Sequence, residues 1–288
     1  MSAMGDGSWL TLRRDSVTLA GYEYSQSGPS IILLHGLLGH AREWDDTAEW
    51  LSPTSRVLAL DMRGHGRSER NPPSMSLSDL VEDVVSWAHR LNTQRVVLVG
   101  QSLGGLVSFL VAARHSHLVE GLVVVEASPS ADEHAPARVR AWLRTWPQVF
   151  SSREAAVAFF GGDSLRAHAW TSGLEPKAGG VTPAFDESSV LRALDESAQR
   201  DYWEDWRHII CPTLVVRGEL GLDPAVAEAM VAAIPQGHLA TIAKAHHDVH
   251  LEQPGEWRDA LARFLTTLNT IGTRRLRRPS ASQARGPF

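Results

Sequence analysis

The chain has 288 residues, of which 43% are hydrophobic and 21% are charged, which is ordinary for a globular protein with a full core. Five arginines follow Gly272 without any acid, which leaves 23 Lys and Arg against 33 Asp and Glu before them, a charge of −10, and argues against a nucleic-acid-binding body. The single cysteine, Cys211, excludes an intrachain disulfide, and no apolar run approaches the roughly 20 residues of a membrane helix. Because Met1–Trp9 does not resemble a signal peptide, we expect a cytoplasmic protein with no membrane or nucleic-acid partner.

The first strands lead to a glycine-containing loop. Two alternating stretches, Trp9–Leu12 and Ser16–Ala20, predict an antiparallel hairpin, and Ser30–Leu34 predicts a buried strand. This strand runs into His35–Gly39 (HGLLG), where backbone N–H groups are free to turn toward one point. An oxyanion hole needs such N–H groups, with Leu37 as one donor, although an ordinary glycine turn explains the same residues equally well.

A charged turn and a capped helix follow. Arg56–Leu60 predicts a strand that ends in Asp61–Ser68 (DMRGHGRS), which lacks the lysine and the spacing of a phosphate-binding P-loop. We interpret this turn as structural, fixed by Asp61 and Arg63. Ser76 and Asp79 have the spacing of a capping box, so a helix with one apolar face should start there.

A serine between glycines stands at the centre of the chain. Val96–Val99 predicts a strand buried on both faces, and Leu106–Ala113 predicts a buried helix. The residues between them contain Ser102 in the pattern G-x-S-x-G, the nucleophile elbow, in which a strained turn needs neighbours without bulk. The alternative is that Ser102 only caps the helix after a glycine turn.

The next strand, Gly121–Val125, ends at a charged residue, Glu126. Strands and helices therefore alternate, which predicts an α/β fold with a doubly wound, mostly parallel sheet. Residues 130–208 change pattern, with helical fragments broken by glycines and no convincing strand, so we interpret them as an inserted helical cap. Aromatic residues are frequent in it, and we expect some to line an apolar pocket and others to attach the cap to the core; they are Trp142, Trp146, Phe150, Phe159, Phe160, Trp170, Trp203 and Trp206.

The C-terminal part completes the sheet and contains a group of histidines. Thr213–Val216 and His238–Ile242 predict strands, and Pro224–Ile234 predicts a helix that Asp223 caps. The segment Ala245–Pro254 contains the histidines. A metal site is one interpretation of His246, His247 and His250, but no Cys, Asp or Glu at ligand spacing completes a typical one, so we expect no metal. Histidine has a pKa suited to activating a serine near neutral pH, and His247 is the candidate base.

The end of the chain is predicted to be a helix and a tail. Gly255 to about Leu268 should form the last helix, and residues 273–288, rich in Arg, Pro and Ser, should be a disordered basic tail. The predicted domain limits are therefore 1–129 and 209–272 for the core, 130–208 for the cap and 273–288 for the tail.

Four motifs occur in an order that resembles the α/β-hydrolase superfamily, over about residues 31–268. They are His35-Gly36, Asp61–Ser68 (DMRGHGRS), Gly100–Gly105 (GQSLGG) and His247–Pro254 (HDVHLEQP). The resemblance implies Ser102 as nucleophile, His247 as base, and the amides of Leu37 and Leu103 as the oxyanion hole. It also implies a cofactor-free enzyme. Members of the family normally have glycine before the histidine, where this chain has His246.

The acid that would orient the histidine has two candidates. The family's usual position, three residues after the glycine that ends the strand before the acid loop, is Gly221 here. Asp223 lies two residues further on, where it also suits the helix cap. Other members place the acid at the end of the preceding strand, where this chain has Glu126. A charged residue that ends an apolar strand at this edge needs a reason, so we favour Glu126 over Asp223.

The serine narrows the chemistry to acyl transfer, because relatives that open epoxides or displace halide have aspartate at the elbow. We therefore expect a serine hydrolase of carboxylic esters, lactones or thioesters with an apolar or aromatic part, acting as a monomer or homodimer. Hydrolysis of a carbon–carbon bond is an alternative that shares every motif. A ligand-binding receptor that has kept the fold is another.

Overall fold

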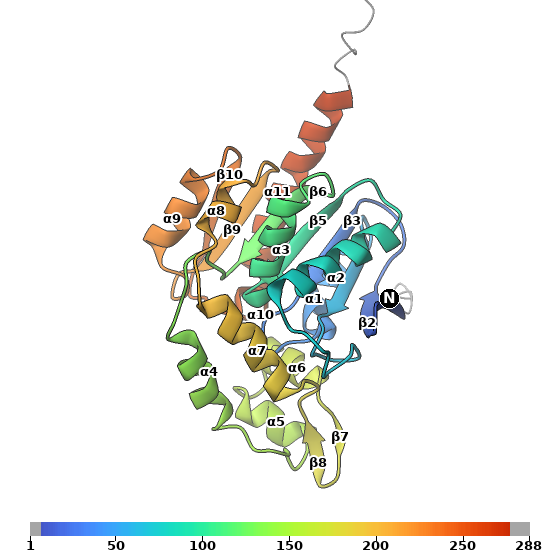
Figure 1. The fold of residues 1–288 in the computed structure, drawn as a ribbon, viewed down its shortest axis with the longest axis vertical. Coiled ribbons are helices and arrows are strands. Elements are labelled where there is room, and N and C mark those ends of the chain that lie inside the picture. The colour runs from blue at the N-terminus through green and yellow to red at the C-terminus, as the bar shows by residue number, and fades with distance from the viewer. Residues whose placement is uncertain (1–6, 277–288) are drawn as a thin grey trace, which may run out of the picture.

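A sheet of eight strands forms the centre of the protein in the computed structural model, which describes residues 7–276 (Figure 1). The strand order is β1-β2-β4-β3-β5-β6-β9-β10. β2 pairs antiparallel with β1 and β4, and all other neighbours are parallel, as predicted. The strands are β1 (Ser8–Arg14), β2 (Val17–Glu23), β3 (Ser30–Leu34), β4 (Arg56–Asp61), β5 (Val96–Gln101), β6 (Val119–Val125), β9 (Thr213–Gly218) and β10 (Gly237–Ile242).

Helices cover both faces of this sheet, because alternate residues of the central strands point to opposite sides and nearly all are apolar. In β3, Ile32 and Leu34 face one helical layer, while Ile31 and Leu33 face the other. The first layer contains α2 (Leu77–Arg90), α3 (Leu103–Arg114), α8 (Trp203–Arg207) and α9 (Pro224–Ala232). The second contains η1 (Ala41–Trp44), α1 (Asp45–Leu51), α10 (Val249–Glu252) and α11 (Pro254–Leu276).

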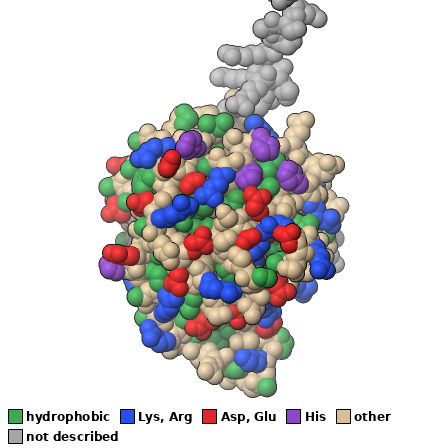
Figure 2. Space-filling model, in the orientation of Figure 1, with side chains coloured by type: hydrophobic (Ala, Val, Ile, Leu, Met, Phe, Trp, Pro, Cys, Tyr) green, Lys and Arg blue, Asp and Glu red, His purple; other side chains and the backbone are tan. Residues whose placement is uncertain are grey.

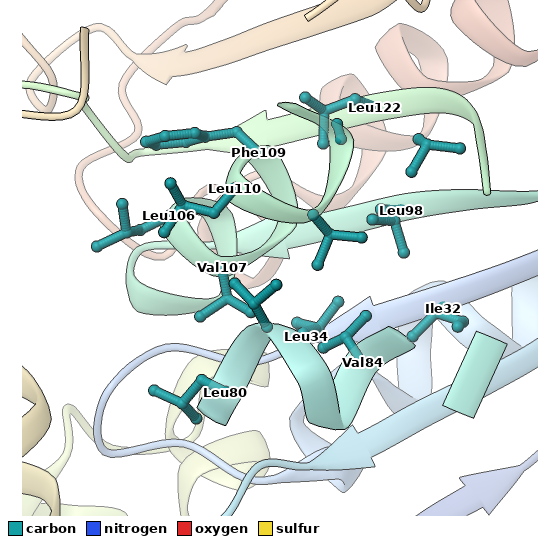
Figure 3. Close-up of a cluster of buried hydrophobic side chains, with 14 of the residues drawn as sticks. Ile32, Leu34, Leu80, Val84, Leu98, Leu106, Val107, Phe109, Leu110 and Leu122 are labelled. Carbon is teal, nitrogen blue, oxygen red and sulfur yellow. The ribbon is translucent and has the colours of Figure 1, made fainter. Parts of the chain in front are cut away.

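The largest part of the core lies between the sheet and the pair α2 and α3. Figure 3 shows Val107 and Leu110 of α3 and Leu80 and Val84 of α2 in one cluster with the strand residue Leu34. The predicted capping box is confirmed, since Ser76 Oγ accepts from Asp79 N at 3.1 Å. This packing holds α3, and with it the residue just before the helix, against the end of β5.

Most of residues 130–208, all except the end that contains α8, form a separate layer at one end of the sheet (Figure 1). Its helices are α4 (Ala135–Leu143), α5 (Arg153–Phe159), α6 (Leu165–Ser172) and α7 (Glu187–Ala198). The expectation that no strand occurs here is wrong, because β7 (Glu175–Lys177) and β8 (Gly180–Thr182) form an antiparallel hairpin. Three-residue strands leave too short a pattern to recognise. Gly179 lies in the turn with φ 88° and Gly180 begins β8 with φ 150°, so these glycines serve the hairpin rather than a helix end.

The last helix is longer than predicted. α11 runs to Leu276 rather than ending near Leu268, so disorder does not begin at Thr273 as expected. A single glycine, Gly272, costs a helix only about 1 kcal/mol, and the first proline after it is Pro279. Residues 1–6 and 277–288 lie outside the described residues; they include part of the stretch searched for a signal peptide and most of the predicted disordered tail.

Acidic and basic side chains alternate over the face of the molecule drawn in Figure 2, without a large patch of one sign. Between residues 7 and 276, no helix combines the length and the apolar character needed to cross a membrane. The charged turn Asp61–Ser68 is mostly buried. Asp61 accepts from Ala41 N at 2.7 Å and from Arg67 N at 2.8 Å, and Arg63 binds Asp83 through two nitrogens, which confirms that Asp61 and Arg63 fix the charged turn.

Candidate active site

A cavity of about 630 Å³ lies between the carboxyl edge of the sheet and the cap. Loops at the ends of parallel strands are where ligand sites of open α/β sheets occur. The core contributes residues from five separate segments, and the cap contributes an aromatic wall. The core residues that matter below are Leu37, Ser102, Leu103, Glu126 and His247, and the cap residues are Trp142, Phe160 and Trp170.

Ser102 occupies a strained turn between β5 and α3. Its backbone angles are φ 53° and ψ −118°, and its N–H donates to Val125 O at 2.9 Å. A Cβ at Gly100 would collide with Gly104 O, and a Cβ at Gly104 would collide with Leu34 O. The glycines therefore permit the close approach of strand and helix that the sequence pattern predicts. Such strain persists only where the surroundings enforce it, and it turns the serine toward the cavity.

The loop after β3 lies beside this serine. A Cβ added to Gly36 would be 3.5 Å from Ser102 Cβ and would displace the end of the Gln101 side chain, so Gly36 lies directly beside the serine. His35 is fully buried, its Nε2 accepts from Met62 N at 3.0 Å, and its Nδ1 therefore donates to Gly36 O at 2.7 Å. Burial lowers the pKa of His35 well below its ordinary value, which keeps this neutral tautomer.

The bond from His35 sets the direction of the Leu37 N–H. Gly36 O and Leu37 N belong to the same planar trans peptide, so their bonds point in opposite directions. Fixing the carbonyl with His35 therefore fixes the N–H. Leu103 supplies a second N–H because it is the first residue of α3 and has no partner within the helix at its own N-terminus. These two amides are the predicted oxyanion donors, and both residues line the cavity.

His247 lines the cavity next to Asp248. Its Nδ1 is 3.5 Å from Glu126 Oε2, and its backbone carbonyl accepts from Gln101 Nε2 at 3.0 Å. The imidazole remains 56% exposed through the cavity, whereas the Glu126 side chain is 3% exposed. Burial by the surrounding protein lowers the pKa of His247, but the bond to Glu126 and the charge of Asp248 outweigh it, so the pKa is raised.

Glu126 has a cradle of backbone donors. Its carboxylate accepts from Gly218 N at 2.7 Å and from Leu222 N at 2.9 Å, and its own φ is 51°, a second strained position at this edge. A Cβ at Gly221 would collide with the carboxylate. The carboxylate therefore fills the space next to Gly221, the position where the family usually has its acid, although it comes from a different strand.

The other candidate acid lies elsewhere. Asp223 caps α9, accepting from Ala225 N at 2.8 Å and Val226 N at 3.3 Å, and it is exposed. The structure thus brings Ser102, Glu126 and His247 to one cavity and leaves Asp223 outside its lining.

The neighbouring histidines point to different partners. His246 Nδ1 lies 3.3 Å from Glu252, on the exposed side, and His250 is buried, stacked on Trp44 at 4.0 Å. The three histidines therefore have different partners. Among the described residues, no group of three or more His, Cys, Asp or Glu side chains is placed to hold a metal ion.

Two cavity residues escaped the sequence reasoning. Asp248, next to His247, accepts from Trp170 Nε1 of the cap at 3.2 Å. Glu43 of η1 is buried against the loop after β3, with its carboxylate 3.8 Å from His250, and burial together with the charge of Asp248 raises its pKa well above the ordinary value. The sequence does point to Asp248, since this acid directly follows the candidate base His247. It does not point to Glu43, because this residue lies in a short segment with no motif.

The aromatic residues of residues 130–208 divide as expected into two groups. Trp142, Phe160 and Trp170 line the cavity, and Trp142 is 43% exposed. Phe160 and Trp170 stack with ring centroids 5.5 Å apart. Trp206, in contrast, is fully buried on α3 against Phe109 and donates to Met230 O at 2.8 Å, so it attaches α8 to the core.

A model of the alpha/beta hydrolase family matches residues 31–260. The chain belongs to this family. The (E)-2-((N-methylformamido)methylene)succinate hydrolase of Acinetobacter baylyi is 27% identical over 270 residues, which cover 89% of this α/β hydrolase and 98% of that protein. A putative carbamate hydrolase RutD of Agrobacterium fabrum is 28% identical over 249 residues, covering 82% and 93%.

Solved structures agree with this assignment. The crystal structure of E-2-(acetamidomethylene)succinate hydrolase superposes with a TM-score of 0.79 at 24% identity, covering 90% of this chain and 100% of that one. At this identity the likeness shows the fold. The relatives are named hydrolases, and this protein is an enzyme of the α/β-hydrolase fold.

Proposed function

We propose that this α/β hydrolase cleaves carboxylic esters, lactones or thioesters that have an apolar or aromatic part, through an acyl-enzyme on Ser102. The observation that carries the proposal is the arrangement of Ser102, His247 and Glu126 around one cavity, with Glu126 3.5 Å from His247 Nδ1. The contact with Glu126 leaves Nε2 of the same ring for the serine.

Each group has a defined part in the reaction. His247 takes the proton from Ser102 Oγ as the oxygen attacks the carbonyl carbon. The amides of Leu37 and Leu103 bind the oxyanion, and Glu126 stabilises the imidazolium that forms. The proton then passes from His247 to the leaving group, and water repeats the sequence on the acyl-enzyme. No cofactor enters any of these steps.

The lining of the cavity is the reason to propose a substrate with an apolar part. Leucines of the core and the rings of Trp142, Phe160 and Trp170 form much of its lining, and a volume of about 630 Å³ suits a small molecule. Its two arginines are each close to a carboxylate, Arg138 to Asp132 and Arg166 to Glu252 at 3.6 Å. Substrate contact is therefore mainly apolar.

Labelling with a fluorophosphonate, followed by intact mass, tests the nucleophile. The wild type should gain one label and hydrolyse short-chain and aryl esters, and Ser102→Ala should do neither. Ser86→Ala is a matched control, because this serine lies on α2 outside the cavity lining and donates to Glu82 O. Labelling that persists in Ser102→Ala would contradict the proposal.

The names of the relatives widen the substrate panel. It should include a carbamate and an amidomethylene succinate, whose C–N bonds are also cleaved by acyl transfer, and a diketone, which reports carbon–carbon cleavage through two carbon fragments. Turnover of the esters well above that of the other compounds is the expected result. Tight ligand binding without turnover of any compound would favour a receptor instead.

A further inference from the structure

His65 lies in the charged turn after β4 and joins it to the loop after β3, His35–Gly39, which contains the proposed oxyanion donor Leu37 and is called the oxyanion loop below. The side chain is fully buried. Its Nε2 contacts the carbonyl oxygen of Leu37, and its Nδ1 lies 2.9 Å from Arg63 O. Its ring also packs edge-on against His35, with centroids 4.7 Å apart. His65 is not among the residues that line the cavity, so it meets Leu37 from behind.

The ring holds Leu37 through one hydrogen. Both of its partners are carbonyl acceptors, and a neutral imidazole has a single N–H. Burial lowers the pKa of His65, which favours the neutral ring. We take the hydrogen to be on Nε2, so that the ring donates to Leu37 O, and the two amide variants below test this choice. The carbonyls on both sides of Leu37 Cα are then fixed, Gly36 O by His35 and Leu37 O by His65.

The same turn is bonded to the cap. Gly66 N donates to Ala184 O at 2.5 Å, and Asp186 N donates to Gly64 O at 3.2 Å. Between these bonds, His65 and Phe185 form an isolated antiparallel bridge. The backbone of residues 64–66 therefore contacts the cap, while the side chain of His65 contacts the oxyanion loop. A shift of residues 184–186 would therefore move residues 64–66, and His65 would pass the movement to Leu37.

We propose that His65 is a positioning residue that holds the Leu37 amide in place for the oxyanion and couples it to the cap. The proposal rests on the proposed function, since it takes the Leu37 N–H as an oxyanion donor. Loss of the His65 bond should affect the transition state, in which the oxyanion exists, and leave substrate binding unchanged.

Two amide variants separate the two ring nitrogens. The side-chain N–H of glutamine reaches about as far as Nε2, and that of asparagine about as far as Nδ1. His65→Gln should therefore keep the bond to Leu37, and His65→Asn should lose it. Since removal of an entire oxyanion donor costs about 10²- to 10³-fold, we expect His65→Asn to lower kcat by about 10- to 100-fold with KM unchanged. His65→Gln should recover most of the wild-type kcat.

The measurements are kcat and KM for an aryl ester, the inhibition constant of a boronic acid that forms a tetrahedral adduct on serine, and the melting temperature. The inhibition constant of His65→Asn should rise in step with the fall of kcat. His208→Gln is a matched control, because this exposed histidine also contacts a backbone carbonyl, that of Glu204, but lies outside the cavity lining.

Three results would overturn the inference: equal losses in His65→Gln and His65→Asn that follow their melting temperatures, a change in KM alone, or unchanged kcat in His65→Asn. If the wild type is labelled and active, any of these removes the His65 inference and leaves the proposed function intact. A wild type with neither label nor turnover removes both.

Discussion

Replacing Glu126 by glutamine should lower kcat about 10³- to 10⁴-fold, which corresponds to about 4–5.5 kcal/mol of transition-state stabilisation. One carboxylate oxygen accepts from Gly218 N and Leu222 N, so the amide oxygen of glutamine has to take that place. The NH₂ group then faces His247 Nδ1, which is 3.5 Å from Glu126 Oε2 in the wild type. The imidazole must accept there and has its hydrogen on Nε2, the wrong tautomer for a base.

Asp223→Asn is the matched comparison. Asparagine caps helices about as well as aspartate, and Asp223 serves Ala225 N and Val226 N at the start of α9, so activity should remain close to that of the wild type. The assay is kcat/KM for an aryl ester over a range of pH, with the melting temperature of each variant. A larger loss in Asp223→Asn than in Glu126→Gln would refute the reasoning.

The space beside Gly221 provides a stronger test. Its Cβ would point at the Glu126 carboxylate, so Gly221→Asp alone should crowd the site and reduce activity. In Glu126→Ala, the same aspartate has room and faces His247 from the family's usual position. The double variant should therefore be more active than Glu126→Ala. If it is not, the carboxylate of Glu126 does more than orient His247.

Two further predictions concern protonation. His247 acts as a base only when neutral and its pKa is raised, so the acidic limb of kcat/KM should lie above the ordinary histidine value of about 6.5, and Asp248→Asn should move it downward; an upward move would contradict the assignment. Because the pKa of Glu43 is raised in the folded protein, there is a pH range in which its carboxyl group is protonated in the folded state and ionised in the unfolded state. The free energy of unfolding therefore falls as pH rises above about 4.5. Glu43→Gln lacks this effect and should gain on the wild type by up to about 1.4 kcal/mol per pH unit until the folded pKa is reached, measured by denaturant unfolding; a pH-independent difference would show that Glu43 is ionised.

The strands of the sheet and the start of α2 could be predicted because local chemistry determines them, although β5 and β9 each end two residues later than predicted. Apolar β-branched runs specify strands buried on both faces, and Ser76 with Asp79 specifies a helix start within a few residues. Ser102 was recognisable for the same reason, since the strain of its turn demands glycine at 100 and 104. Each of these signals is contained in a single short segment.

The cap was less predictable because its structure depends on distant contacts. The hairpin of β7 and β8 has three-residue strands, and the segment after it is held by bonds from residues 64–66. Which tryptophans line the cavity depends on how α4 and α6 face each other, and periodicity contains no such information. The end of α11 was missed for a different reason: a glycine and a run of arginines resemble a helix end but do not enforce one.

The missing side chain at Gly221 helps to identify the candidate acid. Gly221 and Glu126 are 95 positions apart in sequence, yet the Cβ of one and the carboxylate of the other compete for the same space. A side chain at 221 would leave the Glu126 carboxylate no room, whereas glycine at 221 admits a longer side chain from the neighbouring strand. Within the loop after β9, Glu219 accepts from Lys244 N and Asp223 caps α9. Reading Gly221 as space to be filled points to β6, the strand that pairs with β9, and to Glu126 as the charged residue at its end.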